Sequence, residues 1–259
     1  EWGDEVRLRP AEVLSLECEP AVGVPPAQNL AWRAARAYGD RVGRTPRVAI
    51  EISKRIPAGA GLGGGSSDAA AVIAGLAHLW GLDPVAEQAL EAARAVGADV
   101  AFFLHGGTAL MTGCGDVLAR RLPSAEAHVT LVWPVDCPVD TGAAYRALDA
   151  SPREVAPTID QLEGALAAGD VALLAASLHN DMTPTSRGLV PQIAEALDLL
   201  GSCESILGSE MCGSGSAVFG IFDSARAADA AADTARRAAF GAVSTKMSEY
   251  GARVHKGDS

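Results

Sequence analysis

A glycine-rich stretch at residues 57–67 has the composition of a phosphate-binding loop. It reads PAGAGLGGGSS and lies between a strand predicted at 47–52 and a helix predicted at 67–80. Glycine has no Cβ atom, so the backbone N–H groups of such a loop can approach a ligand closely. A helix N-terminus adds unpaired N–H donors and a partial positive charge, so loop and helix together can hold an anion without arginine. The alternative is a flexible surface turn.

Three polar residues follow the glycines. Ser66 and Ser67 are of a type that often caps helices, and their hydroxyls could also reach a phosphate or a phosphate-bound Mg²⁺. Asp68 suits the positive end of a helix dipole but would repel phosphate. We therefore expect the Asp68 side chain to point away from any ligand.

Two other nucleotide-binding loops fit this stretch less well. A Walker A loop has a lysine immediately before its serine or threonine, and no lysine precedes Ser66. Gly59, Gly61 and Gly64 satisfy the GxGxxG pattern of dinucleotide-binding enzymes, with an acidic residue, Asp83, about 20 residues farther on. In a Rossmann turn the first glycine directly follows the strand, whereas residues 54–58 intervene here. A dinucleotide-binding oxidoreductase is therefore an alternative that rests on this pattern alone.

Asp99 is the candidate catalytic group. Transfer of a phosphoryl group to an alcohol needs a residue that aligns the hydroxyl and accepts its proton during attack on the γ-phosphorus. A carboxylate close to the bound phosphates can do this. The structural alternative is that Asp99 only caps the short helical turn predicted at 99–104.

Composition and charge exclude several classes of protein. The 259 residues are 49% hydrophobic and 20% charged, which is ordinary for a globular chain and excludes a disordered or fibrous one. A net charge of −11 argues against nucleic-acid binding but not against a small anionic ligand. No apolar run approaches the ~18–20 residues of a membrane span, and no signal peptide opens the sequence. We expect a cytoplasmic monomer or homodimer with a small-molecule substrate and no nucleic-acid or membrane partner.

Neither cysteine nor histidine is arranged for metal binding. The five cysteines and five histidines are scattered, with no CxxC and no Cys/His cluster. We therefore expect reduced thiols, no zinc site, no histidine-based mechanism and no metal site made by the protein alone.

The order of strands and helices predicts an α+β fold rather than a doubly wound sheet. Hairpins occur as well as crossovers, and a lobe boundary is predicted between residues 134 and 135. The predicted strands are at 5–18 with a break at Pro10, 47–52, 107–122 as a pair, 128–134, 205–223 as a strand–loop–strand, and 242–248. The predicted helices are at 29–38, 67–80, 84–96, 141–148, 158–167, 170–178, 189–200 and 224–239, and residues 99–104 are predicted as a short turn of helix or strand.

The loop and several segments elsewhere resemble the GHMP kinase family. The loop matches the central motif of that family, a proline followed by GxGLGGGSSxAA. The other similar segments are QNLAWRAARAY at 28–38, KRIP at 54–57, GADV at 97–100, GGTALMTGCGD at 106–116, TGAAYRALD at 141–149, HND at 179–181 and GSGSAVFGIF at 213–222. The resemblance implies a two-lobed fold, with an ATP-binding lobe at 1–134 and a ferredoxin-like lobe at 135–259. It also implies ATP and Mg²⁺ as cofactors.

The triple glycine followed by Ser-Ser is most similar to one branch of the family. That branch phosphorylates the 2-hydroxyl of 4-diphosphocytidyl-2-C-methyl-D-erythritol in isoprenoid precursor biosynthesis. On this resemblance the catalytic residue is Asp99. The implied nucleotide-binding residues are Asn29, Lys54, Pro57, Ala58, Gly59, Ala60, Gly61, Leu62, Gly63, Gly64, Gly65, Ser66 and Ser67. The implied substrate-binding residues are Thr141, Tyr145, Gly213, Ser214 and Gly215.

Each of these roles has a structural alternative. Lys54 could be a solvated cation at a strand end, and Asn29 could be a helix cap that needs no ligand. Tyr145 could stack on a pyrimidine or pack within its helix. Residues 213–216 could be only the tight turn of a hairpin. We interpret Asn180 and Asp181 of the HND segment as structural.

One segment of the family pattern has no counterpart here. Members of the family begin with an AK.NL.L strand, whose lysine assists the catalytic aspartate, and a GYH stretch that grips the base. None of Lys54, Lys246 and Lys256 matches that lysine by motif. We therefore expect this chain to be N-terminally truncated, with a degenerate kinase as the alternative. Another GHMP kinase and a non-catalytic nucleotide-binding relative also stay open.

Overall fold

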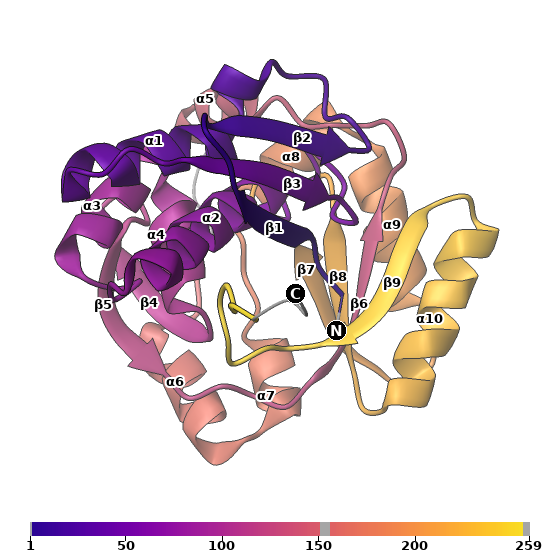
Figure 1. Cartoon of the computed structure of the whole chain (residues 1–259). Helices are drawn as coiled ribbons and strands as arrows, with labels where there is room; N and C mark the ends of the chain where they lie inside the picture. The colour runs from indigo at the N-terminus through magenta and orange to yellow at the C-terminus, as the bar shows by residue number, and fades with distance from the viewer. Residues whose placement is uncertain (1, 151–155, 256–259) are drawn as a thin grey trace. The chain divides into compact units, whose positions relative to one another are not determined.

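The chain forms two compact units, and each unit contains more than one segment of the sequence. The computed structural model describes residues 2–150 and 156–255 (Figure 1). The N-terminal unit contains Trp2–Ile56, Gly63–Leu122 and the chain from Ser248 onward, and the C-terminal unit contains Pro57–Leu62 and Pro123–Met247. The glycine-rich loop therefore begins in one unit and ends in the other. A division into domains at residues 134 and 135 stays a prediction.

The N-terminal unit is built on a three-stranded sheet in the order β1-β3-β2. The central strand β3 (Val48–Ser53) pairs antiparallel with β1 (Glu5–Pro10) and parallel with β2 (Ser15–Glu19). Its sequence VAIEIS alternates β-branched and polar or small residues, so Val48, Ile50 and Ile52 are buried on one face. The chain that follows β3 is the glycine-rich loop.

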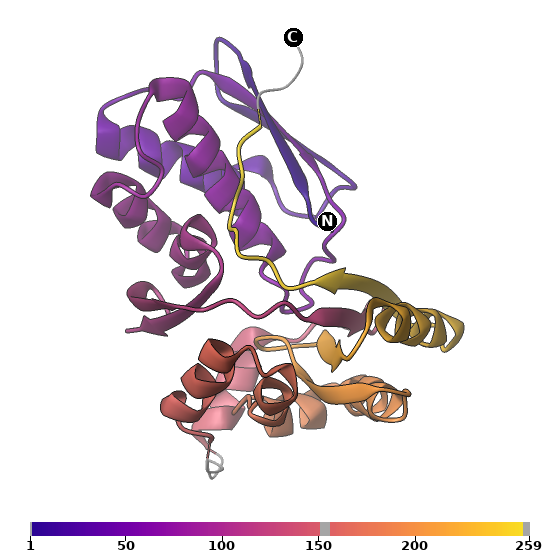
Figure 2. The ribbon, with the colours of Figure 1, turned by 90° about the horizontal axis from the view of Figure 1, so that it is seen from below.

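Four helices cover one face of this sheet, and a hairpin completes the unit. Figure 2 shows the helices to one side of the strands, and the segment after Ser248 running along them. The helices are α1 (Leu30–Val42), α2 (Gly64–Trp80), α3 (Glu87–Val96) and α4 (Ala98–His105). The hairpin is β4 (Thr108–Thr112) with β5 (Val117–Leu122), and a short 3₁₀ helix, η1 (Pro26–Gln28), precedes α1.

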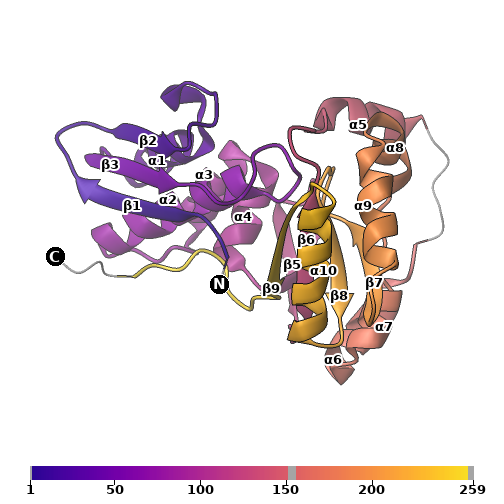
Figure 3. The ribbon, with the colours of Figure 1, turned by 90° about the vertical axis from the view of Figure 1, so that its right-hand side faces the viewer.

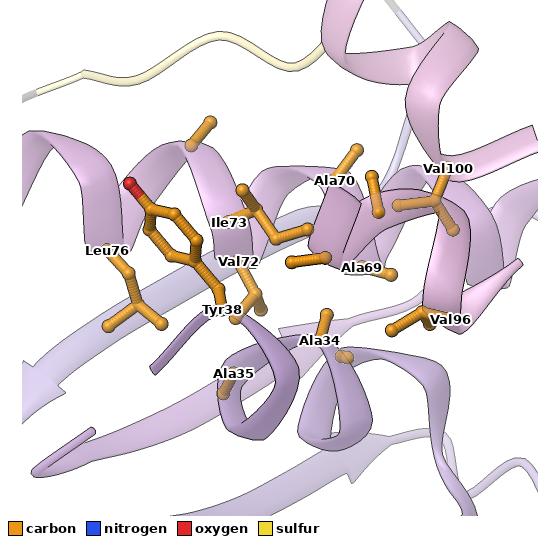
Figure 4. Close-up of a cluster of buried hydrophobic side chains, with 14 of the residues drawn as sticks. Ala34, Ala35, Tyr38, Ala69, Ala70, Val72, Ile73, Leu76, Val96 and Val100 are labelled. Carbon is orange, nitrogen blue, oxygen red and sulfur yellow. The ribbon is translucent and has the colours of Figure 1, made fainter. Parts of the chain in front are cut away.

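Alanine dominates the core between these helices. Figure 4 shows Ala34 and Ala35 of α1 in one cluster with Ala69 and Ala70 of α2, and all four are fully buried. Small side chains let the helix backbones approach closely, so larger residues are needed only where the gap widens. Tyr38 fills one such gap and stacks on Trp80 with the ring centroids 5.5 Å apart. The N-terminus of α2 is therefore attached to a rigidly packed helix.

The C-terminal unit has a four-stranded antiparallel sheet in the order β7-β8-β6-β9. One group of helices connects β6 to β7 and a single helix connects β8 to β9, so the chain follows the split β-α-β of a ferredoxin-like fold. Figure 3 shows α10 along the sheet and α9 near β7 and β8. The strands are β6 (His128–Trp133), β7 (Ile206–Met211), β8 (Val218–Phe222) and β9 (Gly241–Lys246). The helices are α5 (Thr141–Asp149), α6 (Ile159–Ala168), α7 (Val171–Ala176), α8 (Thr183–Leu189), α9 (Gln192–Gly201) and α10 (Ala225–Arg237).

The structure confirms the α+β class and nearly all of the predicted elements. Two differences bear on the site. Helix α2 begins at Gly64 and not at residue 67, because glycines can occupy helical positions that their low propensity argues against. Helix α8 was not predicted, because its sequence TPTSRGL contains a proline, a glycine and two threonines in seven residues.

Replacement of Leu76 by alanine tests the core of the N-terminal unit. Leu76 is fully buried in α2, so Leu76→Ala should lower the free energy of unfolding by about 2–5 kcal/mol. Leu79 lies on the same helix with 50% of its surface exposed, so Leu79→Ala should change that energy by about 0.5 kcal/mol or less. Urea unfolding measures both, and equal losses would show that the core is not where the structure places it.

Candidate active site

Three alternate glycines give the loop its backbone path. Gly59, Gly61 and Gly63 have φ values of +73°, +76° and +68°, in the left-handed region that side chains disfavour. Gly61 also has no space for a side chain, since a Cβ atom there would lie 2.5 Å from the carbonyl oxygen of Cys212 and 2.7 Å from that of Gly215. The glycines are therefore required by the fold of the loop, and the alternative of a flexible surface turn is wrong for Gly61.

The first half of the loop packs on the second glycine-rich turn within the C-terminal unit. The Ala217 N–H donates to the Ala60 carbonyl oxygen at 2.9 Å. Residues 213–216 form the tip of the β7–β8 hairpin, as the structural alternative predicted. A role of Gly213, Ser214 and Gly215 in substrate binding stays a prediction.

The second half of the loop is the start of α2. Gly63 is the N-cap residue, so the prediction that Ser66 and Ser67 cap this helix is wrong. The Ser67 hydroxyl instead donates to the Gly64 carbonyl oxygen at 2.8 Å, and the Ser66 hydroxyl has no partner among the described residues. With a glycine as cap, the first N–H groups of α2 have no side-chain acceptor. They are free to bind an anion.

Lys54 is buried, so the alternative of a solvated strand-end cation is wrong. Its side chain is 7% exposed and its ammonium forms ion pairs with Asp4 and Asp68, whose side chains are 3% and 5% exposed. The Asp68 contact is 2.8 Å long. Asp68 thus points into the N-terminal unit, and its orientation away from a bound ligand stays a prediction. Contact between Lys54 and a nucleotide stays a prediction.

Two carboxylates compete for one ammonium in this cluster, which changes the proton affinities. Burial lowers the pKa of Lys54, but its hydrogen bonds to Asp4 and Asp68 outweigh this and raise it. Burial raises the pKa of Asp68 to about 6, against the opposing effect of Lys54. The Asp68 Oδ1 atom has no hydrogen-bond partner among the described residues, which adds to the cost of its charge.

Asp99 lies in the first turn of α4 with an exposed side chain. The cap of α4 is Gly97, so the alternative that Asp99 caps this helix is wrong. No hydrogen-bond or ion-pair partner of Asp99 is found in residues 2–150 and 156–255. Helix α4 packs on α2, and the ring of Phe103 lies 2.7 Å from the position that a Cβ atom of Gly63 would occupy. The helix that carries Asp99 therefore contacts the cap of the helix that ends the loop.

Asn29 caps α1 as its structural alternative predicted. Its Oδ1 atom accepts the Ala31 N–H at 2.9 Å. A role near the nucleotide is not excluded by this bond, because the side-chain amide group stays available. That role stays a prediction.

Thr141 and Tyr145 lie on α5 of the C-terminal unit. The Thr141 hydroxyl is 3.1 Å from that of Ser214, so two of the predicted substrate residues are neighbours. The Tyr145 side chain is 55% exposed, which leaves its ring free to stack on a ligand and argues against a purely packing role. Its contact with substrate stays a prediction.

Asn180 has the structural role that the sequence predicted, whereas Asp4 and Ser186 were not predicted. The Asn180 amide donates to the carbonyl oxygens of Met211 and Gly213, and the Ser186 hydroxyl donates to that of Ser214. These bonds fix the second glycine turn. Only Asn180 had a detectable signal, the HND segment; a lone serine or aspartate that bonds to distant backbone has none.

Family models match both units. The description "GHMP kinases N terminal domain" matches residues 29–107, and "GHMP kinases C terminal" matches residues 162–241. Among curated proteins, a relative from Desulfitobacterium hafniense is 41% identical over 84% of this chain and 74% of its own length. The chain belongs to the GHMP kinase family.

Several curated relatives of this GHMP kinase have the name 4-diphosphocytidyl-2-C-methyl-D-erythritol kinase. The relative from Paramagnetospirillum magneticum is 36% identical over 89% of this chain and 80% of its own length. The one from Mycobacterium tuberculosis is 44% identical over 75% of this chain, which spans 63% of that relative's length.

Solved structures agree on the fold. A crystal structure of 4-(cytidine 5'-diphospho)-2C-methyl-D-erythritol kinase has a TM-score of 0.76 and 32% identity, covering 94% of this chain and 85% of its own. Homoserine kinase from Cytophaga hutchinsonii has a TM-score of 0.75 at 22% identity, covering 97% and 88%, which shows the shared fold alone. The Rossmann alternative is therefore wrong.

No group of three or more His, Cys, Asp or Glu side chains in residues 2–150 and 156–255 is placed to hold a metal ion. In the same ranges no helix is long and apolar enough to cross a membrane.

Replacement of Gly61 by alanine tests the packing of the loop. The new Cβ atom would combine an unfavourable φ with overlap of two carbonyl oxygens, so Gly61→Ala should lower the free energy of unfolding by about 2–4 kcal/mol. Gly164 lies in α6 with open space around it, so Gly164→Ala should raise that energy by about 0.5–1 kcal/mol. Urea unfolding measures both free energies. A Gly61→Ala variant as stable as wild type would contradict the loop geometry.

Asp68 should make stability depend on pH. The folded protein holds this proton more tightly than the unfolded chain, because the pKa rises from 3.8 to about 6. The stability that protonated Asp68 contributes is therefore fully present below the pKa of Asp68 in the unfolded chain. It is lost as the pH rises through the pKa of Asp68 in the folded protein. Between about pH 4 and about pH 7, the free energy of unfolding of wild type should fall by about 2–3 kcal/mol relative to that of Asp68→Asn. Urea unfolding at each pH measures this difference. If the free energy of unfolding changed with pH in the same way for both proteins, the raised pKa of Asp68 would be refuted.

Proposed function

We propose that this GHMP kinase transfers the γ-phosphoryl group of ATP to the 2-hydroxyl of 4-diphosphocytidyl-2-C-methyl-D-erythritol. The observation that carries the proposal is the identity of 41% and 36%, over 84% and 89% of this chain, to relatives that bear the name of that kinase. The glycine-rich loop and the exposed Asp99 supply the chemistry that such a reaction needs. A cytoplasmic location, as monomer or homodimer, belongs to the same proposal.

The loop and the start of α2 bind the triphosphate of ATP. Within this stretch Gly59 and Gly61 carry backbone N–H groups with no side chain beside them, and the glycine-capped helix adds its own unpaired donors. Backbone donors suit a chain with a net charge of −11, because they attract an anion without a cluster of basic residues. Asn29 and Lys54 complete the nucleotide-binding set.

The residues present fit a magnesium ion held mainly by the nucleotide. Mg²⁺ prefers oxygen ligands and usually keeps phosphate oxygens and waters, so it needs few protein groups. Ser66 fits better than Ser67, whose hydroxyl already donates to Gly64. When bound, the ion would neutralise charge on the phosphates during transfer.

Asp99 accepts the proton of the attacking hydroxyl. The substrate oxygen forms a bond to the γ-phosphorus, the bond from this phosphorus to the bridging oxygen of ADP breaks, and the hydroxyl proton passes to the Asp99 carboxylate. An exposed carboxylate with no competing partner in the part of the chain that the structure describes is free to do this. Thr141, Tyr145 and the turn at residues 213–215 hold the diphosphocytidyl end of the substrate.

Replacement of Asp99 by asparagine tests the proposed reaction. Asp99→Asn should lower kcat by about 10²–10⁴-fold, with little change in the KM for ATP or in thermal stability. The control is Asp160→Asn, which changes another exposed first-turn aspartate and should leave kcat unchanged. ADP production with Mg·ATP and the substrate is the assay, and full activity of Asp99→Asn would refute the role.

The assay should include a form of the protein extended by any residues encoded upstream. Activity of either the present chain or the extended form, if Asp99→Asn abolishes it, would support the proposed kinase reaction. A form that binds ATP but transfers no phosphoryl group would instead favour the non-catalytic relative. Turnover that is indifferent to the cytidine base would favour another GHMP kinase.

Tyr145 should contribute to recognition of the cytosine base. Loss of base stacking costs about 1–3 kcal/mol, so Tyr145→Ala should raise the KM for the diphosphocytidyl substrate about tenfold while the KM for ATP stays unchanged. Tyr145→Phe keeps the ring and should keep the KM. Steady-state kinetics with each substrate varied in turn provide the test, and equal behaviour of the two variants would exclude stacking.

A further inference from the structure

Three charged side chains are buried together beside the glycine-rich loop, and all lie in the N-terminal unit. Asp4 precedes β1, Lys54 follows β3, and Asp68 is on α2. Their side chains are 3%, 7% and 5% exposed. We call Asp4, Lys54 and Asp68 the loop clamp.

Asp4 holds the chain that leads into the loop. Its Oδ1 atom accepts the N–H groups of Arg55 and Ile56 at 2.6 and 2.8 Å, and its Oδ2 atom accepts from the Lys54 ammonium. These residues come immediately before Pro57. A single carboxylate therefore fixes both the backbone and the side chain at the start of the loop.

Lys54 connects that end of the loop to the other. Its ammonium donates to Asp68 at 2.8 Å, on the fifth residue of α2. A Cβ atom on Gly64 would lie only 3.2 Å from the same nitrogen, so the ammonium also lies against the first residue of the helix. The clamp thus joins the backbone at Arg55 and Ile56 to the helix at Gly64 and Asp68.

Stability is a poor explanation for such a cluster. Buried ion pairs lose much of their attraction to desolvation, and apolar side chains of similar volume often stabilise a protein as well or better. Here one ammonium faces two carboxylates, and the Asp68 Oδ1 atom has no partner. What the charged groups provide is direction, because each hydrogen bond fixes an angle as well as a distance.

We propose that Asp4 and Asp68 are positioning residues for nucleotide binding, which act through Lys54 by fixing both ends of the glycine-rich loop. Neither aspartate needs to touch the nucleotide. The clamp sets the direction in which the loop and the start of α2 present their N–H groups. This inference deepens the proposed function and rests on its ATP-binding part, not on phosphoryl transfer to the substrate.

Asp68 gives the sharpest test, because positioning and simple charge repulsion predict opposite results. Removal of a carboxylate near a phosphate site should tighten ATP binding if repulsion dominates. If Asp68 positions the loop, Asp68→Ala should weaken ATP binding about tenfold despite the lost negative charge. Isothermal titration with Mg·ATP, without the second substrate, measures the Kd, and tighter binding by Asp68→Ala would overturn the proposal.

A double-mutant cycle shows whether Asp4 acts through Lys54. Asp4→Asn and Lys54→Met should each raise the Kd for Mg·ATP about tenfold, and the double variant should be no worse than either one. Multiplied effects would mean that the two residues act independently and would contradict the clamp. Asp160→Asn serves as the matched surface control.

Hydrogen exchange separates positioning from general stability. Loss of the clamp should speed amide exchange at residues 55–67 while exchange in α1 and α3 stays unchanged. A purely structural role would speed exchange throughout the N-terminal unit and leave the Kd of the folded fraction unchanged. If Asp4→Asn does not fold, Asp68→Ala carries the same comparison.

The two proposals fail in different ways. If no form transfers phosphate to the substrate but Kd and exchange change as expected, the proposed function is wrong and the clamp stands. If transfer occurs as proposed but the Asp4 and Asp68 variants keep the wild-type Kd and exchange, the clamp is wrong and the function stands.

Discussion

A side chain at Gly61 would overlap the carbonyl oxygens of Cys212 and Gly215, so the loop can follow its path only with glycine at that position. The same backbone path leaves N–H groups uncovered and turns the chain into α2 without a polar cap. The anion binding that we propose and the packing of the loop therefore have one physical origin, the absence of Cβ atoms. A strongly acidic chain can bind a polyanion in this way with very few cations.

The glycines make the loop possible, but they do not fix it. Glycine adopts many backbone conformations, so a loop of this composition needs contacts outside itself to hold one shape. Its first half bonds to the second glycine turn through Ala60 and Ala217, and that turn is fixed by Asn180 and Ser186. Its second half is the start of a helix packed through alanines, with Lys54 bridging to Asp4 and Asp68.

Much of the fold could be predicted from the sequence, because its local patterns agree with its tertiary structure. The alternation in β3 and the helical spacing in α2 both predict the faces that are buried. Helix α8 could not be predicted in this way, since TPTSRGL has the composition of a loop and is helical only in its tertiary context.

The candidate site was predictable where composition carried the information. Five glycines before Ser-Ser indicate a phosphate loop, and the motif around Asp99 resembles a kinase aspartate. The burial of Lys54 was not predictable, because it depends on Asp4, fifty residues earlier in the chain. Pairings at such separations leave no periodicity in a single sequence.

The most direct test of the central claim follows the phosphate itself. The protein would be incubated with Mg²⁺, ATP labelled at the γ-phosphate and 4-diphosphocytidyl-2-C-methyl-D-erythritol, and the product would be analysed by ³¹P NMR and mass spectrometry. The account predicts one labelled phosphate on the 2-hydroxyl of the substrate for each ADP formed. Label released only as inorganic phosphate, or attached at another position, would contradict it.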